Sequence, residues 1–284
     1  MRLAVLEGRT VIVEGQAFVD VARASRGEHG PDVMNLYERW PAFVAWAAGP
    51  IAAAAVREPL PATSFDAPSP RPRQAFGIGV NYADHASEAG LVAPSAPMVF
   101  AKFPSCIVGP SAPLQITVPT VDWEVELVVV MGRVAHQVEK AEAWSYVAGL
   151  TVGQDLSDRQ LQMAGTPPQF NLGKSRPGYG PIGPWLVTPD DLADRDDLEI
   201  GCTLNGEVVQ HSRTRHLIFD VAAIVSYLSS VLTLWPGDLI FTGTPSGVGF
   251  MRSPPRYLIP GDRLVSTIEG IGELVTHAVA GVPA

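Results

Sequence analysis

The chain contains very little cysteine, and that scarcity argues against two kinds of architecture. Its 284 residues include only Cys106 and Cys202, which lie far apart, form no CxxC pair and have no neighbouring histidine. The pattern indicates neither a disulfide framework nor a zinc site. We expect both thiols to be buried as small hydrophobic side chains.

Charge is also scarce, and its balance is acidic. Charged residues form 17% of the chain, the formal net charge is −9, and no block of lysine or arginine occurs. An acidic chain of this kind is not expected to bind nucleic acid or an anionic membrane surface.

Long apolar segments are absent too. No run of 18 apolar residues occurs, and residues 1–15 carry charges and glycines where a secretory signal requires an unbroken apolar segment. We therefore expect a cytoplasmic protein that does not use a membrane as a partner.

Hydrophobic residues, glycine and proline are plentiful instead. Hydrophobic residues form 46% of the chain, enough for a large core. Five of the 26 prolines fall within residues 57–73, which we interpret as an extended linker. The sequence thus predicts a small N-terminal α+β domain with its linker over residues 1–70, and a larger domain over residues 71–284.

Most of the expected elements are short β-strands separated by glycine and proline, a pattern typical of a sandwich or barrel-like core. A helical region over residues 33–56 contains Pro41 and Pro50 and is expected to form two helices. Residues 218–234 predict the one long helix of the larger domain. The fold class is therefore α+β and rich in β-structure. Strands are expected at residues 3–7, 10–13, 17–21, 75–80, 98–102, 123–131, 146–152, 185–188, 198–204, 239–242 and 263–268.

An acidic pattern stands out between the expected strands. Asp122, Glu124 and Glu126 alternate with apolar residues, so a strand would place all three carboxylates on one face. Asp155 follows the next apolar run and would add a fourth carboxylate. Oxygen ligands of this type suit Mg²⁺, Mn²⁺ or Ca²⁺. The alternative is a strand with one solvated acidic face.

A second pattern combines a histidine with an acid. His85 and Glu88 are three residues apart and would share one face of a short helix, where the carboxylate could orient the imidazole as a general base. Residues 90–97 follow as a possible lid. An incidental surface pair is the alternative.

Two cations and a glycine-rich loop complete the candidate residues. Arg159 and Lys174 could bind a substrate carboxylate or a developing oxyanion, although Arg159 could instead pair with Asp155 four residues earlier. Lys174 has no obvious acidic neighbour in the sequence. Thr244 lies in the loop of residues 241–249, which could hold an anion or form a simple tight turn. The loop lacks the Lys-Ser/Thr of a nucleotide-binding P-loop.

Seven segments, in this order, closely resemble the fumarylacetoacetate hydrolase family over about residues 74–275. They are GIGVNYADHASE, PMVFAKFPSCIVGP, VDWEVELVVVMGR, VAGLTVGQDLSDRQLQ, LGKSRPGYGPIGPWLVT, LNGEVVQ and LWPGDLIFTGTPSGVG. The resemblance implies a β-rich roll of mixed sheets, a homodimer and a bound Mg²⁺ or similar divalent ion. The N-terminal region resembles the variable extra domain of bacterial members.

The resemblance also implies roles for individual residues. Those roles place Asp122 beside the metal but outside its ligand set. One departure is Arg176, which follows the motif lysine where many members carry an Asp-containing segment; it would favour a more anionic substrate tail. The implied metal ligands are Glu124, Glu126 and Asp155, the catalytic residues His85, Glu88 and Lys174, and the substrate-binding residues Arg159, Gln162 and Thr244, to which we add Tyr82.

These assignments predict a metal-dependent hydrolase that cleaves the C–C bond of 2,4-dioxo acids such as acylpyruvates. The family resemblance equally admits an oxaloacetate decarboxylase, a hydratase or an isomerase, because its motifs do not separate these activities. A non-catalytic module that binds a metal and an anion is the alternative from another class.

Overall fold

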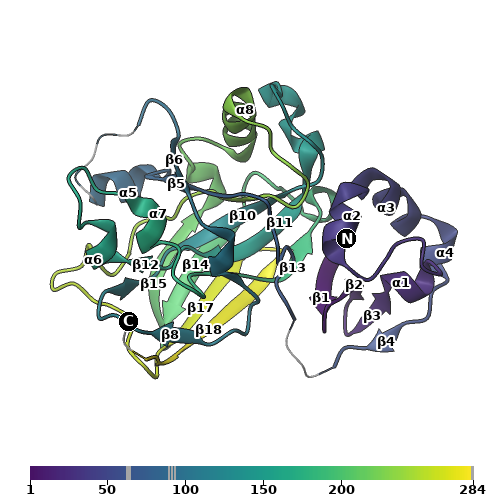
Figure 1. The fold of residues 1–284 in the computed structure, drawn as a ribbon, viewed down its shortest axis with the longest axis horizontal. Coiled ribbons are helices and arrows are strands. Elements are labelled where there is room, and N and C mark those ends of the chain that lie inside the picture. Colours follow the sequence, from purple (N-terminus) through teal and green to yellow (C-terminus); the bar gives the residue numbers. More distant parts are fainter. Residues whose placement is uncertain (62–64, 89, 91, 93, 283–284) are drawn as a thin grey trace.

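A computed structural model describes residues 1–61, 65–88, 90, 92 and 94–282, and the side chains at positions 51 and 85–87 lie outside this description. The chain folds into three β-sheets with short helices around them (Figure 1). The predicted β-rich α+β fold with mixed sheets is confirmed. No sheet of the described residues closes into a barrel.

The largest sheet has eleven strands in the order β4-β3-β2-β1-β13-β11-β10-β16-β5-β6, with β7 paired to β13. Most neighbours are antiparallel, but β16 pairs with β5 and β13 with β7 in parallel. Its strands are β1 (Arg2–Leu6), β2 (Arg9–Glu14), β3 (Ala17–Asp20), β4 (Glu58–Pro59), β5 (Ala75–Gly79), β6 (Met98–Ala101), β7 (Ile107–Val108), β10 (Val125–Met131), β11 (Val147–Gln154), β13 (Gly180–Val187) and β16 (Leu239–Phe241).

A five-stranded sheet has the order β15-β14-β17-β18-β8, and β9 pairs with β12 in a third, two-stranded sheet. The sequence did not predict β15 or β18. β18 alternates between buried and more exposed residues, and β15 mixes the two without strict alternation, so polar positions interrupt the apolar runs on which the prediction relied. These strands are β8 (Leu114–Ile116), β14 (Glu199–Leu204), β15 (Glu207–Arg213), β17 (Arg263–Ile268) and β18 (Gly272–Ala280), with β9 (Val121–Asp122) and β12 (Ser157–Asp158).

The helices are short. Two helices were expected over residues 33–56, and the structure has three there. Pro41 and Pro50 lie in the first turns of the second and third of these helices, where the backbone needs no amide hydrogen. The long helix is confirmed in a shorter form, α8, which begins after Asp220, whose carboxylate accepts from the Ala223 N–H. The α-helices are α1 (Val21–Ala24), α2 (Val33–Glu38), α3 (Trp40–Ala47), α4 (Pro50–Ala53), α5 (Ala83–Glu88), α6 (Arg159–Gln162), α7 (Phe170–Gly173) and α8 (Val221–Val231).

The described residues also form the 3₁₀ helices η1 (Pro104–Cys106), η2 (Lys140–Tyr146), η3 (Pro189–Asp191) and η4 (Thr214–His216). Within the described residues, no helix has both the length and the apolar character needed to cross a bilayer.

The N-terminal strands extend the main sheet. β1 pairs with β13 through Arg2–Val187 and Leu3–Leu186, so the sheet runs without interruption from the N-terminal strands into the rest of the chain. The division of the chain at about residue 70 stays a prediction. Figure 1 shows α1 to α4 at the N-terminal end of the sheet and α5, α6 and α7 grouped at the other end.

The centre of the main sheet is formed by β10 and β11. Every residue of both strands is buried, which explains their nearly continuous apolar sequences. Glu126 is the one charged residue within them. A buried carboxylate at this position requires a hydrogen-bond partner or a cation.

Candidate metal and substrate site

Three buried carboxylates meet at one end of β10 and β11. Val125 pairs with Gln154 in this antiparallel ladder, and the Asp155 N–H donates to the Glu124 carbonyl oxygen at 2.9 Å, so Glu124 and Asp155 are brought side by side. Together with Glu126 they offer one oxygen each within 4.8 Å of one another. We call Glu124, Glu126 and Asp155 the carboxylate triad. They are the predicted metal ligands.

Asp122 does not join the triad, so the expectation of a single strand face was wrong for this residue. The strand is interrupted between β9 and β10, and Asp122 turns instead towards the loop that contains Gly249. Its carboxylate accepts from the backbone N–H groups of Gly249 at 2.7 Å and Phe250 at 3.0 Å. A side chain at position 249 would lie 2.7 Å from the Asp122 oxygen, so glycine permits this close approach.

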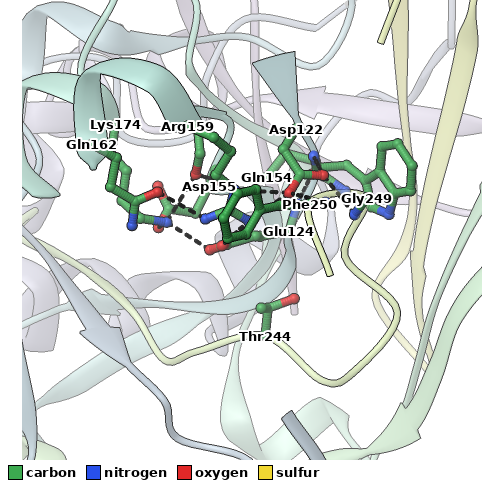
Figure 2. A network of polar contacts seen from close by, with 12 residues as sticks. Asp122, Glu124, Gln154, Asp155, Arg159, Gln162, Lys174, Thr244, Gly249 and Phe250 are labelled. Carbon is green, nitrogen blue, oxygen red and sulfur yellow. Dashed lines mark hydrogen bonds and ion pairs between the residues drawn. The ribbon is translucent and has the colours of Figure 1, made fainter. Parts of the chain in front are cut away.

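Lysine ammonium groups neutralise two members of the triad (Figure 2). The Lys174 Nζ donates to Glu124 at 2.7 Å and to Asp155 at 2.6 Å. It therefore has acidic partners that its neighbours in the sequence did not indicate.

Lys102, which the sequence analysis did not select, contacts the other Asp155 oxygen at 2.6 Å. Burial is the largest single influence and disfavours the Lys102 charge, but the charge and hydrogen bond of Asp155, together with Cys106 and Glu126, outweigh it and hold the pKa of Lys102 above its ordinary value. The one signal in the sequence was a lone lysine inside an apolar segment, which requires a partner when buried.

Arg159 links the triad to Asp122. Its guanidinium donates to Asp122 at 2.8 Å, to Glu124 at 2.6 Å and to the Gln162 amide oxygen at 2.9 Å. The alternative pairing with Asp155 is therefore wrong, because Arg159 begins α6 and the preceding residues are extended rather than helical.

The network has more acidic than basic groups. We call this set of seven buried side chains the charge network: Asp122, Glu124, Glu126, Asp155, Lys102, Arg159 and Lys174. Four carboxylates face three cations, and burial, followed by the charges of Asp155 and Glu124, raises the pKa of Glu126 well above its ordinary value.

Glu126 also accepts from the Gly243 N–H at 2.8 Å. Gly243 has φ of 105°, a conformation that favours glycine, and a Cβ there would lie 2.7 Å from Asn81. The close approach of this N–H to Glu126 therefore depends on glycine. An oxygen-rich site with one excess negative charge fits a hard divalent cation such as Mg²⁺ or Mn²⁺.

A cavity of about 130 Å³ opens next to the triad. Its polar and charged lining residues include Glu124, Glu126, Arg159, Gln162 and Lys174. Its apolar lining side chains include Phe100, Met163, Phe170, Val248, Phe250 and Met251. A larger cavity of about 560 Å³ lies between the N-terminal strands and α3 and α4, but it contains no member of the charge network. The smaller cavity is therefore the candidate site.

Of the two remaining residues predicted to bind substrate, Thr244 lines the cavity and Tyr82 does not. Thr244 lines the cavity, but its hydroxyl already donates to the Val125 carbonyl oxygen and accepts from Gln210. Tyr82 is fully buried, does not line the cavity, and its hydroxyl has no hydrogen-bond partner in the described part of the chain. Its predicted role in substrate binding has no support from this position.

The expected catalytic pair and lid are described only in part. Glu88 accepts from the Gly247 N–H at 3.0 Å, which ties α5 to the loop that carries the apolar wall. The His85 side chain lies outside the described residues, as do parts of the expected lid at residues 90–97. The roles of His85 and Glu88 stay predictions.

Arg176 does not reach the cavity. Its guanidinium pairs with Asp158 at 2.9 Å, and it is not among the residues that line the site. The expectation that Arg176 favours an anionic substrate tail is therefore wrong, because Asp158 already neutralises it.

Comparisons with known proteins agree with this geometry. A family model described as the fumarylacetoacetate hydrolase C-terminal region matches residues 74–279. A mitochondrial oxaloacetate tautomerase from Bos taurus is 41% identical over 223 residues, which cover 78% of this chain and 71% of the relative.

Solved structures share the fold over nearly the whole chain. A crystal structure of a protein given the name HpcE, from Mycobacterium smegmatis, is 51% identical, with a TM-score of 0.93 and 99% of both chains covered. Maleylpyruvate hydrolase from Sphingobium sp. SYK-6, in complex with manganese(II) and pyruvate, is 28% identical, with a TM-score of 0.82, and the alignment covers 99% of this chain and all of the other.

Proposed function

Since the chain belongs to the fumarylacetoacetate hydrolase family, we propose that it is a divalent-metal-dependent hydrolase that cleaves a C–C bond of 2,4-dioxo acids. Proteins similar to it are named as tautomerases and hydrolases, and one of them was solved with manganese(II) and pyruvate. The observation that carries the proposal is the carboxylate triad, buried beside a cavity and left with one excess negative charge.

The triad would hold Mg²⁺, with Mn²⁺ or Ca²⁺ as alternatives. A bound divalent ion would supply positive charge for the 2-oxo acid end of the substrate and would stabilise negative charge on its oxygen atoms. Lys102 keeps Asp155 in place, and the Gly243 N–H does the same for Glu126. Arg159 orients Glu124 by holding it against Asp122.

Lys174 would provide the cation for the developing oxyanion. Its Nζ already lies among three oxygen atoms, those of Glu124, Asp155 and Ser157, at the edge of the cavity. An ammonium group preorganised in a buried site stabilises a tetrahedral oxyanion without further rearrangement of solvent.

The predicted water-activating pair is His85 with Glu88. In this mechanism His85 takes a proton from water, the resulting hydroxide adds to the C4 carbonyl carbon, and the bond between C3 and C4 breaks. The bond's electron pair remains on C3 as an enolate, and a proton transferred to C3 yields the shorter 2-oxo acid and a carboxylic acid. Because α5 is tied to the Gly247 loop, the helix that carries His85 is connected to the wall of the cavity.

The test is turnover of a panel of acylpyruvates by the purified protein with Mg²⁺ or Mn²⁺, before and after treatment with EDTA. We expect activity that is lost on removal of the metal and returns when the metal is restored. Hydrolysis that continues after complete removal of the metal would overturn the proposal.

A second candidate is keto–enol tautomerisation of oxaloacetate, favoured by the bovine relative of that name. In this reaction a proton moves between C3 and the oxygen on C2, and no water attacks the substrate. A metal at the triad would serve both reactions, so EDTA treatment does not distinguish them. The two reactions are distinguished by measuring the enol absorbance of oxaloacetate and the cleavage of acylpyruvates in parallel.

The expected homodimer and the cytoplasmic location remain predictions beside this function.

A further inference from the structure

Part of the cavity lining consists of aromatic and methionine side chains. Phe100, Met163, Phe170, Phe250 and Met251 face the space beside the triad. Phe100 and Phe170 meet edge to face, with ring centroids 5.8 Å apart, so part of the wall is a fixed aromatic surface. These side chains offer no cation and no hydrogen-bond donor to a substrate carboxylate.

The two cations on the cavity wall are held beside the carboxylate triad. Lys174 Nζ lies 5.1 Å from the centroid of the Phe100 ring and is paired with two carboxylates. The Arg159 guanidinium lies 5.8 Å from the centroid of the Phe250 ring and is likewise paired with two carboxylates. Their carboxylate partners therefore hold both cations at the charge network, rather than free to pair with the far end of a substrate tail.

No further basic side chain is available for the tail. The described residues that line the cavity include no lysine or arginine beyond Lys174 and Arg159. The residues outside the description, at positions 51, 62–64, 85–87, 89, 91, 93 and 283–284, include no lysine or arginine either. A carboxylate at the far end of a substrate would have to leave water for an apolar wall, which is costly without a partner.

The charge balance leads to the same conclusion. Four carboxylates of the charge network face three cations, so a divalent ion leaves one net positive charge. One substrate carboxylate, the one beside the 2-oxo group, neutralises it. A second carboxylate would make the buried site negative again.

We propose that the site selects 2-oxo acid monoanions with a short, uncharged, apolar tail, and that the Phe100–Phe170–Phe250 wall with Met163 and Met251 is the specificity element. This inference rests on the proposed hydrolase function and deepens it, and it disfavours the second candidate, because oxaloacetate carries a second carboxylate. A cavity of about 130 Å³ is close to the roughly 150 Å³ of an engineered cavity that holds benzene, so it limits the tail to a few carbon atoms.

A matched pair of probes tests the proposal by binding alone. 2-Oxopentanoate and 2-oxoglutarate have the same five-carbon chain and the same 2-oxo acid end, but only the second ends in a carboxylate. In titration calorimetry with excess Mg²⁺, we expect 2-oxopentanoate to bind about tenfold or more tightly than 2-oxoglutarate, because the terminal carboxylate meets no cation. Affinity should also rise about fourfold for each methylene added to pyruvate until the cavity is full.

A charge added at the cavity should reverse the preference. Met163 lines the cavity and is 47% exposed, so Met163→Lys can be accommodated by the fold and places an unpaired cation near the tail. Leu172 is 62% exposed and does not line the cavity, so Leu172→Lys is the matched control. We expect Met163→Lys to gain affinity for 2-oxoglutarate by several fold, whereas Leu172→Lys keeps the preference of the original protein.

The outcomes separate this inference from the proposed function. If 2-oxoglutarate binds as tightly as 2-oxopentanoate, the site takes 2-oxo acids but the tail inference is wrong. If neither probe binds in the presence of Mg²⁺, the site does not take 2-oxo acids, and the proposed function fails with the inference. An equal response of the two lysine variants would show that the effect is long-range electrostatics rather than contact with the tail, and would also overturn the inference.

Discussion

Glu126 is the carboxylate of the charge network that has no direct ion pair among the described residues. It lies inside a fully buried strand, and burial together with Asp155 and Glu124 raises its pKa. The three cations of the charge network contact the other three carboxylates directly. The excess negative charge is therefore concentrated at Glu126, which makes this carboxylate the most sensitive reporter of metal binding.

Glu126→Gln should weaken metal binding steeply while the fold survives. The amide keeps the shape of the side chain but removes one charge from a site of oxygen ligands. Metal affinity is measured by calorimetry on protein first stripped with EDTA. An unchanged affinity together with a raised melting temperature would contradict the assignment, because it would mean that the triad is only a cluster of repelling acids.

His85→Ala should separate hydrolysis from tautomerisation. Hydrolysis requires a base within reach of the attacking water, so the variant should lose about 10²–10⁴-fold in acylpyruvate turnover. Tautomerisation of oxaloacetate requires no attacking water and should largely persist. Both kcat and KM are measured for each substrate, because closure of a lid would change KM for both. Hydrolysis at the original rate would show that His85 is an incidental surface residue.

At the scale of single residues, the sequence predicted the triad but not which cations pair with which carboxylates. Alternation and the position of Asp155 after a strand indicated four candidate carboxylates, Asp122 among them, and the resemblance to the family selected the three of the triad. Lys102 was missed because its partner, Asp155, is 53 residues away. Tyr82 was also selected as a substrate-binding residue, yet it is buried and does not line the cavity. Local patterns indicate which residues could bind a metal, whereas ion pairs between distant residues require the fold.

At the scale of elements, the loop that carries Val248, Phe250 and Met251 is held from two sides. Asp122 accepts from the N–H groups of Gly249 and Phe250, and Glu88 of α5 accepts from Gly247. The apolar wall is therefore positioned by a carboxylate of the charge network, which couples the metal end of the cavity to the tail end.

Asp122→Asn should loosen this wall and destabilise the protein. Arg159 would keep Glu124 but lose one of its two buried carboxylate partners, a change that typically costs about 3 kcal/mol. We expect a lower melting temperature and a raised KM for acylpyruvates, with a smaller change in kcat, because the wall binds substrate but does not react. Asp197→Asn, in a partly exposed pair with Arg213, is the control and should have a much smaller effect. Equal losses in both variants would contradict a special role for Asp122.

The sequence predicted elements well where apolar runs were long and poorly where a strand was amphipathic or interrupted. β10 and β11 were found because both of their faces are buried. The interruption between β9 and β10 was not foreseen, because the alternating pattern continues unbroken through Trp123. Hydrogen bonds from the Gly249 loop, 127 residues away, hold Asp122 out of line with its neighbours. Such a break is set by tertiary contacts rather than by local propensity.

At the scale of the whole molecule, the site depends on segments that are far apart in the sequence. Lys102 follows β6, Glu126 lies in β10, Lys174 ends α7, and Gly243 follows β16. The sheet order brings β10, β16, β5 and β6 together as neighbours, which helps to bring these residues to the carboxylate triad. A divalent ion bound there would connect the ends of several elements, so metal binding and global stability should be linked.

This linkage should depend on pH through Glu126. Because the pKa of Glu126 is raised above 4.5 in the folded protein, its contribution to the stability of the metal-free form is fully present below pH 4.5 and is lost as the pH rises through the folded-state pKa. Metal binding requires the ionised carboxylate, so the ion replaces a proton at low pH but meets a ready anion at high pH. Excess Mg²⁺ should therefore raise the melting temperature more at pH 8 than close to pH 4.5.

Scanning calorimetry of the protein in EDTA and in excess Mg²⁺ at the two pH values measures this difference. Glu126→Gln is the matched control, because it cannot lose a proton at this position and should show a smaller stabilisation by Mg²⁺ that varies much less with pH. If the original protein and the variant were stabilised equally and with the same pH dependence, Glu126 would not be a ligand. The excess charge of the network would then be neutralised by a proton rather than by a metal.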